Sequence, residues 1–139
     1  MRRRRRQAGS ALIELAGALI LLVTLLTGIF QTGYSFYTYD VLVNAVRAGG
    51  RYASLAAPRS SNGAELSKAV RNLVVYGDPQ AVAGKSIVPG LEPREVEVVL
   101  QPASVTVSVR GFAIDALFTK VRLDGRPTVT FPVTGGVER

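Results

Sequence analysis

The sequence GSALIELAGALILLVTLLTGIF, residues 9–30, decides the fold of this chain, and Glu14 is its single charged side chain. About 20 apolar residues, each advancing a helix by about 1.5 Å, are enough to cross the hydrocarbon core of a bilayer. We therefore predict a membrane-spanning helix over residues 11–30. Glu14 needs a function, because a carboxylate inside such a helix costs about 2.5–3.5 kcal/mol on insertion scales.

Five consecutive arginines, residues 2–6, precede the apolar run. Basic flanks of a membrane span stay in the cytoplasm, so the chain should run from a cytoplasmic N-terminus to an extracytoplasmic C-terminal part. The residues after Phe30 make a poor signal-peptidase site, so we expect the apolar helix to remain attached. The other basic residues nearly balance the 10 acidic ones, and we therefore expect no nucleic-acid partner.

The composition excludes several kinds of catalysis. The 139 residues include no cysteine and no histidine, which removes disulfide frameworks, thiol nucleophiles, Cys/His zinc sites and imidazole chemistry. The acidic residues form no metal-spaced set, and the glycine pairs lack the Lys-Ser/Thr context of a phosphate-binding loop. We therefore predict no enzymatic activity, no cofactor and no metal site.

Residues 31–57 contain no proline, so the helix is predicted to continue outside the membrane. From residue 11 to residue 57 it would measure about 70 Å. Aromatic residues cluster at positions 34–39, either as an aromatic belt at the membrane surface or as part of a packed face. The apolar side chains near three-and-four spacing predict the buried face; they are Tyr34, Phe36 or Tyr37, Val41, Ala45, Ala48, Tyr52 and Leu55.

Residues 58–139 are predicted to form a small extracytoplasmic α+β domain. Asn62, with Glu65 three residues later, is typical of a capping box that begins a helix. Gly77 is placed to end this helix. The apolar stripe between them is Leu66, Ala69, Val70, Leu73 and Val74. Residues 78–93 carry three prolines and two glycines and predict an irregular loop.

Three segments of this domain predict an antiparallel β-sheet. Residues 95–100 and 104–110 alternate apolar and polar side chains, which is the period of half-buried strands. Residues 128–133 give a third strand, with Pro132 at an edge or near an end. Residues 112–123 leave two alternatives: a helix with Ile114, Leu117, Phe118 and Val121 on one face, or a strand extended through Phe112 and Ile114.

The start of the apolar run resembles the processing site of type IV prepilins and pseudopilins. Gly9 directly precedes the run, and Glu14 is the fifth residue after it. The resemblance implies that a prepilin peptidase cleaves between Gly9 and Ser10, removes the basic leader of residues 1–9 and leaves the helix of residues 10–57. Glu14 could then neutralise the new, cationic α-amino group, on its own chain or on a neighbour. The alternative is that Glu14 lies at the membrane surface and reaches water.

The segment NAVRAGGRYA, residues 44–53, resembles the N-A-x-R-E-G-A-R-Y-A signature of the TadE-like family, minor pseudopilins of the Tad/Flp tight-adherence pilus. The matching signature residues are Asn44, Arg47, Gly49, Arg51, Tyr52 and Ala53. Ala48 and Gly50 depart from the signature. We interpret the glycine pair as a point where another element approaches the helix, with a frayed or kinked helix as the alternative. Both arginines either contact acids, of the outer domain or of a partner subunit, or face solvent.

The resemblance implies a structural subunit of a type IV-like Tad pilus, a system of adhesion and secretion, in the bacterial inner membrane and possibly in the pilus itself. The implied partners are a prepilin peptidase, other pilin or pseudopilin subunits, an inner-membrane assembly platform and membrane lipid. The alternative function is an uncleaved, signal-anchored envelope binding protein with a small extracytoplasmic domain.

Overall fold

The computed structural model describes residues 2–81, 83–116 and 120–133. It divides into two compact units, Met1–Tyr34 and Ser35–Arg139, and the long helix α1, Arg2–Ala56, contributes to both. Within these described ranges, the second unit adds one further α-helix and five short strands. The α+β class predicted from the sequence is confirmed.

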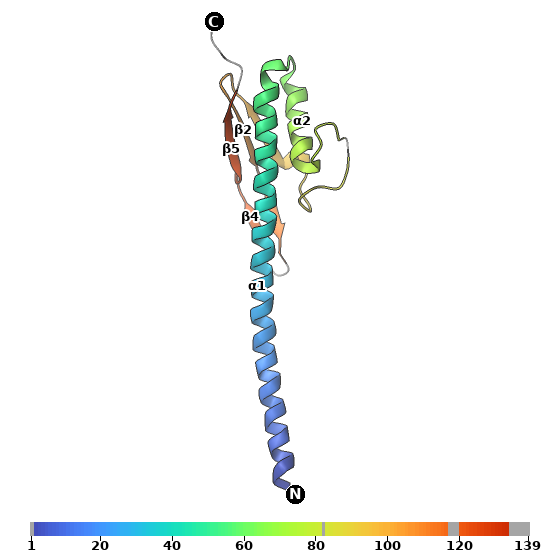
Figure 1. Cartoon of the computed structure of the whole chain (residues 1–139), viewed down its shortest axis with the longest axis vertical. Helices are drawn as coiled ribbons and strands as arrows, with labels where there is room; N and C mark the ends of the chain where they lie inside the picture. The colour runs from blue at the N-terminus through green and yellow to red at the C-terminus, as the bar shows by residue number, and fades with distance from the viewer. Residues whose placement is uncertain (1, 82, 117–119, 134–139) are drawn as a thin grey trace. The chain divides into compact units, whose positions relative to one another are not determined.

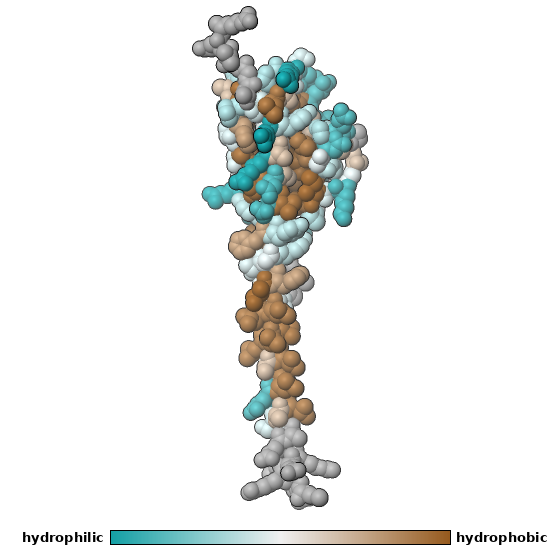
Figure 2. Space-filling model, in the orientation of Figure 1, coloured by the Kyte–Doolittle hydropathy of each residue, from teal (hydrophilic) through white to brown (hydrophobic). Residues whose placement is uncertain are grey.

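In the first unit, α1 exposes its apolar side chains, as Figure 2 shows by the brown surface of this segment. Ile13 is 76% exposed and Leu21 is 74% exposed. The hydroxyl of Thr24 donates to the carbonyl oxygen of Ile20 at 2.8 Å, so this polar group is satisfied inside the helix. By length and composition alone, one helix in the described part of the chain is apolar enough to cross a membrane.

In the second unit, residues 35–56 of α1 lead through a short 3-10 helix, η1 (Ala57–Arg59), to α2, Gly63–Tyr76. The predicted N-cap is confirmed, because Asn62 Oδ1 accepts a hydrogen bond from the N–H of Ala64 at 3.1 Å. This bond goes to the second helical residue, whereas a capping box would use the third. Gly77 is the predicted C-cap, with φ +79°.

The predicted three-stranded sheet is also confirmed. Strands β1 (Val96–Leu100), β2 (Ser104–Val109) and β5 (Thr128–Pro132) are antiparallel in the order β1-β2-β5. Val107 of β2 lies opposite Val98 on one side and Val129 on the other. Pro132 ends the edge strand β5, where its missing N–H breaks no ladder in the middle of the sheet.

The segment with two alternatives is a hairpin. β3 (Phe112–Asp115) pairs with β4 (Lys120–Leu123), and Ile114 lies opposite Val121. The helical alternative was therefore wrong for the described residues of this segment, while Leu117 and Phe118 lie outside them. Phe112 and Ile114, two residues apart in β3, are both buried. The side chains that enter the core therefore follow the alternation of a strand and not the spacing of a helix. The predicted irregular loop leads into a second 3-10 helix, η2 (Pro93–Glu95).

One hydrophobic core holds the second unit together, with α1 and α2 lying side by side and the sheet next to them (Figure 1). Side chains at 0% exposure come from all three parts; they are Leu42, Val46, Ala53, Val70, Val74, Val75, Val105, Val107 and Val109. The loop after α2 adds Val88 and Leu91. The backbone N–H of Ile87 bonds the carbonyl oxygen of Val75 at 2.7 Å, which fixes this loop against α2.

The buried face of α1 differs from the prediction. Tyr52 and Leu55 were expected to be buried, but Leu55 is 56% exposed. The face that packs on the core carries smaller side chains; they are Thr38, Leu42, Ala45, Val46, Gly49, Gly50, Ala53 and Ser54. Of the predicted residues, Ala45 is buried but Ala48 is exposed, and the buried Leu42 and Val46 were not predicted. The prediction therefore chose a stripe of α1 that is rotated away from the face that packs on the core.

The aromatic residues at positions 34–39 divide between two environments. Tyr39 is half-buried and packs against the core of the second unit. Phe36 is 71% exposed and Tyr37 is 68% exposed. A packed role is therefore shown for Tyr39, and the aromatic belt remains a prediction for the exposed rings.

Candidate assembly surface and partner-binding clefts

The predicted processing residues lie on the exposed surface of α1. Gly9, Ser10 and Glu14 are all exposed, and Glu14 has apolar neighbours on both sides. A Cβ built on Gly9 meets nothing within 4 Å. Glu14 lies four residues, or about one helical turn, beyond Ser10. The surface therefore offers a carboxylate within an apolar stripe, and its role in assembly stays a prediction.

The signature residues separate into an inward and an outward group. Gly49 is buried, while Asn44, Arg47, Arg51 and Tyr52 are exposed. The inward group serves the fold of the second unit. The outward group lies on a surface that the described fold leaves open to other molecules.

The glycine pair is where two elements approach α1. A Cβ on Gly49 would overlap Cγ2 of Val74 in α2, and a Cβ on Gly50 would lie 2.7 Å from Cδ2 of Phe131 in β5. The helix continues through both glycines without interruption. The close approach interpreted from the sequence is confirmed, and fraying at this point is wrong.

The polar signature residues make few contacts within the fold. Asn44 Nδ2 donates to Oδ2 of Asp40 at 3.3 Å, one turn earlier in α1. Ion pairs in the described part of the chain are Arg94–Glu92, Arg110–Glu97 and Lys120–Asp115. Arg47 and Arg51 therefore pair with no acid among the described residues, which leaves a partner or solvent as the open alternatives for both.

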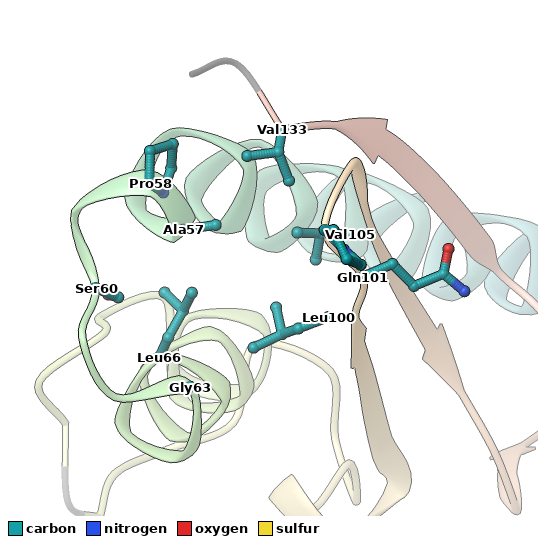
Figure 3. Close-up of a pocket in the computed structure, with 10 residues that line it drawn as sticks. Ala57, Pro58, Ser60, Gly63, Leu66, Leu100, Gln101, Val105 and Val133 are labelled. Atoms are coloured by element: carbon teal, nitrogen blue, oxygen red, sulfur yellow. The ribbon is translucent and has the colours of Figure 1, made fainter. Parts of the chain in front are cut away.

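An apolar cleft lies where α1 ends, beside the tip of the β1–β2 hairpin, with a volume of about 560 Å³. Leu66 of α2 and Leu100 of β1 lie across from one another in it (Figure 3). The lining residues are Ala57, Pro58, Ser60, Gly63, Leu66, Leu100, Gln101, Pro102, Val105 and Val133. No ionisable side chain is among them, so the cleft suits an apolar group.

A second cleft, of about 410 Å³, lies between α1 and the turn that precedes β5. We call it the Arg47–Arg126 cleft, after its two charged residues. Its lining residues are Tyr39, Val43, Arg47, Gly125, Arg126, Pro127, Thr128 and Val129. Both charged groups are guanidinium cations, so the cleft suits an anion.

The described residues give no sign of metal chemistry. Within the ranges 2–81, 83–116 and 120–133, no group of three or more His, Cys, Asp or Glu residues could hold a metal ion. The features that the described residues do offer are one apolar and one cationic cleft, both suited to binding.

Two functional candidates, Arg126 and Ser54, were not predicted from the sequence. Arg126 follows a glycine in a turn between two strands, a context that is typical of solvated loops. Ser54 is buried and lies on the α1 face that was misplaced. The small residues along α1 could have indicated the face that carries Ser54. For Arg126 no sequence signal exists, because nothing in the sequence pairs it with Arg47.

These features define an α+β protein with an exposed apolar helix and a small packed domain. Residues 9–51 match the family model described as TadE-like protein. The match confirms the resemblance and begins at the glycine of the predicted processing site. No curated protein and no solved structure matches the chain. A TadE-like segment indicates a part in the Tad pilus system, and the apolar helix is compatible with a single-pass membrane anchor there.

Proposed function

We propose that this chain is a pseudopilin-type structural subunit of a Tad/Flp pilus, cleaved by a prepilin peptidase between Gly9 and Ser10. The observation that carries the proposal is the TadE-like match over residues 9–51. The exposed apolar surface of α1 supports it, because that surface needs lipid or other helices around it. Before assembly the helix is held in the inner membrane, with its basic end in the cytoplasm.

Apolar contact alone does not move such a helix from membrane to filament. Lipid tails are as apolar as leucine, so exchanging lipid for a neighbouring helix gives little hydrophobic driving force. Specific packing and polar pairing must therefore favour the filament over the membrane. Glu14 is the one charged side chain in residues 9–30, and it is therefore the group that we assign to this step.

Cleavage creates the partner for Glu14. The new α-amino group of Ser10 has an ordinary pKa of about 7.7–8.0 and is mostly cationic at neutral pH. After cleavage Glu14 also lies near the first turn of the shortened helix, where the helix dipole stabilises an acid by about 0.3–1 kcal/mol. The same pairing can form between one subunit and the amine of its neighbour, which sets the register of the two helices.

The mass of the N-terminus in protein purified from its own host tests this proposal. We expect the mature chain to begin at Ser10. Gly9→Val should keep the leader, and Gly17→Val is the matched control, because a Cβ at either position meets nothing within 4 Å. A complete leader on subunits recovered from assembled fibres would overturn the proposal, as would normal processing of Gly9→Val.

The alternative, an uncleaved anchor for an envelope binding protein, has one observation in its favour. The apolar cleft beside Leu66 and Leu100 has the size of a small-ligand site. The same mass measurement separates the two functions, since a binding protein of this kind keeps residues 1–9 and stays in the membrane fraction.

A further inference from the structure

We propose that the Arg47–Arg126 cleft binds a carboxylate-bearing segment of a partner protein. The proposal concerns a surface of the second unit and does not depend on cleavage at Gly9 or on the pilus role. It gives a function to Arg47, an exposed residue that makes no contribution to the packing of the fold.

No ion pair in the described part of the chain involves the two cations of the cleft, and the nearest acids in sequence, Asp40 and Asp124, do not line it. No residue that lines the cleft is acidic. Asp40 lies near Tyr39 in sequence, but its carboxylate accepts a hydrogen bond from Asn44 and does not line the cleft. Two guanidinium groups that face one cleft repel each other, so an anion between them is favourable.

The walls of the cleft indicate which anion fits. Tyr39, Val43, Pro127 and Val129 supply apolar surface beside the two cations. A volume of about 410 Å³ is larger than a bare ion needs and lies in the range of sites for organic ligands. Guanidinium groups bind carboxylates through two parallel hydrogen bonds. An acidic side chain with an apolar neighbour therefore matches both parts of the lining.

The residues of the cleft come from ordered elements. Tyr39, Val43 and Arg47 are spaced by four in α1, so they form one stripe along that helix. On the opposite side, Thr128 Oγ1 donates to the carbonyl oxygen of Gly125 at 2.5 Å and closes the turn that carries Arg126. A turn held in this way reduces the ordering that binding requires.

The test uses the full chain in micelles of a nonionic detergent. The probes are a blocked Leu-Glu-Glu-Leu peptide, the same peptide with glutamine in place of glutamate, and inorganic phosphate, each followed by NMR shifts of backbone amides. We expect saturable shifts at the amides of residues 125, 126, 128 and 129, which flank Pro127, with the glutamate peptide alone. Arg47→Gln and Arg126→Gln should each weaken binding about three- to tenfold.

Arg51→Gln is the matched control, because Arg51 is exposed one turn further along α1 and does not line the cleft. Its peptide affinity should stay within about twofold of the unaltered protein. Equal weakening by Arg51→Gln would overturn the proposal in favour of general attraction by positive charge. Equal binding of phosphate would overturn the assignment to a carboxylate. If none of the three probes gave saturable shifts, the site itself would be overturned.

Discussion

Ser54 Oγ donates a hydrogen bond of 2.5 Å to the carbonyl oxygen of Pro132. The bond joins the last turn of α1 to the last residue of β5, across 78 positions of the sequence. Pro132 has no N–H, and this bond occupies its carbonyl group. An added strand therefore finds neither a backbone donor nor a free backbone acceptor at this residue of the edge strand, which limits uncontrolled strand pairing there.

Ser54→Ala should destabilise the second unit by about 0.5–1 kcal/mol. The bond is part-buried and Pro132 is an exposed residue, so its loss costs the net value of an ordinary hydrogen bond, about 0.5–1.5 kcal/mol, and the better helix propensity of alanine offsets a few tenths of that. The measurement is thermal unfolding of the full chain in nonionic detergent. Tyrosine fluorescence is a suitable signal, because the chain has five tyrosines and no tryptophan.

Ser67→Ala is the control for this variant. The hydroxyl of Ser67 donates to the carbonyl oxygen of Gly63 at 2.8 Å, within α2 itself. Its loss should leave stability unchanged or slightly higher, because the bond joins no separate elements. If the two variants behaved alike, the link between α1 and β5 would contribute nothing measurable.

Gly49→Ala should destabilise the second unit by up to about 2 kcal/mol, although alanine is the better helix former. The new methyl group would overlap Cγ2 of Val74, a fully buried and β-branched side chain with little freedom to move. Overpacking of this kind costs about 1–3 kcal/mol, against a gain of about 1 kcal/mol in propensity. Thermal unfolding under the same conditions measures the difference.

Gly50→Ala and Gly33→Ala complete that series. Phe131, which faces Gly50, is only half-buried, so its ring can turn aside and the cost should be smaller than at Gly49. Gly33 has open space around it, and alanine there should not lower stability. An order in which Gly33→Ala was the most damaging of the three would contradict the packing described for the glycine pair.

Gly77→Ala should destabilise α2 by about 1–2 kcal/mol. Gly77 ends the helix with φ +79° and its N–H bonds the carbonyl oxygen of Leu73, a conformation that strains any residue with a side chain. Its Cβ would also lie 3.2 Å from Ile87 Cδ1. Urea unfolding followed by circular dichroism measures the loss. Gly84→Ala, whose Cβ would make an ordinary contact of 3.8 Å with Tyr76, should be close to neutral.

Sequence patterns predicted most elements because local chemistry determines them. Asn62 and Gly77 mark the two ends of α2 through a side-chain acceptor and a left-handed conformation, which need no knowledge of the rest of the fold. The alternation of valines predicted β1 and β2 in the same way. Residues 112–123 were ambiguous because a short apolar segment fits both periods.

The buried face of α1 could not be predicted by hydropathy, because its packing depends on what approaches it. Gly49 and Ser54 contribute little apolar surface, yet they contact α2 and β5 most closely. The Arg47–Arg126 cleft has the same origin. Its two arginines are far apart in sequence, and only the chain path after β4 brings Arg126 to α1.

Glu14→Gln should leave membrane insertion and processing intact but reduce incorporation into pili at least about tenfold. Glutamine keeps the size of the side chain and removes its charge. The proposed pairing with the α-amino group of Ser10 would then be lost where a low dielectric makes such a pairing strongest. Immunoblots that compare the sheared pilus fraction with the membrane fraction measure this ratio.

Glu14→Asp keeps the charge on a shorter side chain and should retain part of the incorporation. Thr24→Ala, which removes only a hydroxyl bonded within its own helix, should incorporate normally. Wild-type amounts of Glu14→Gln in sheared fibres would show that helix packing alone selects this subunit, and the carboxylate would then have no part in assembly.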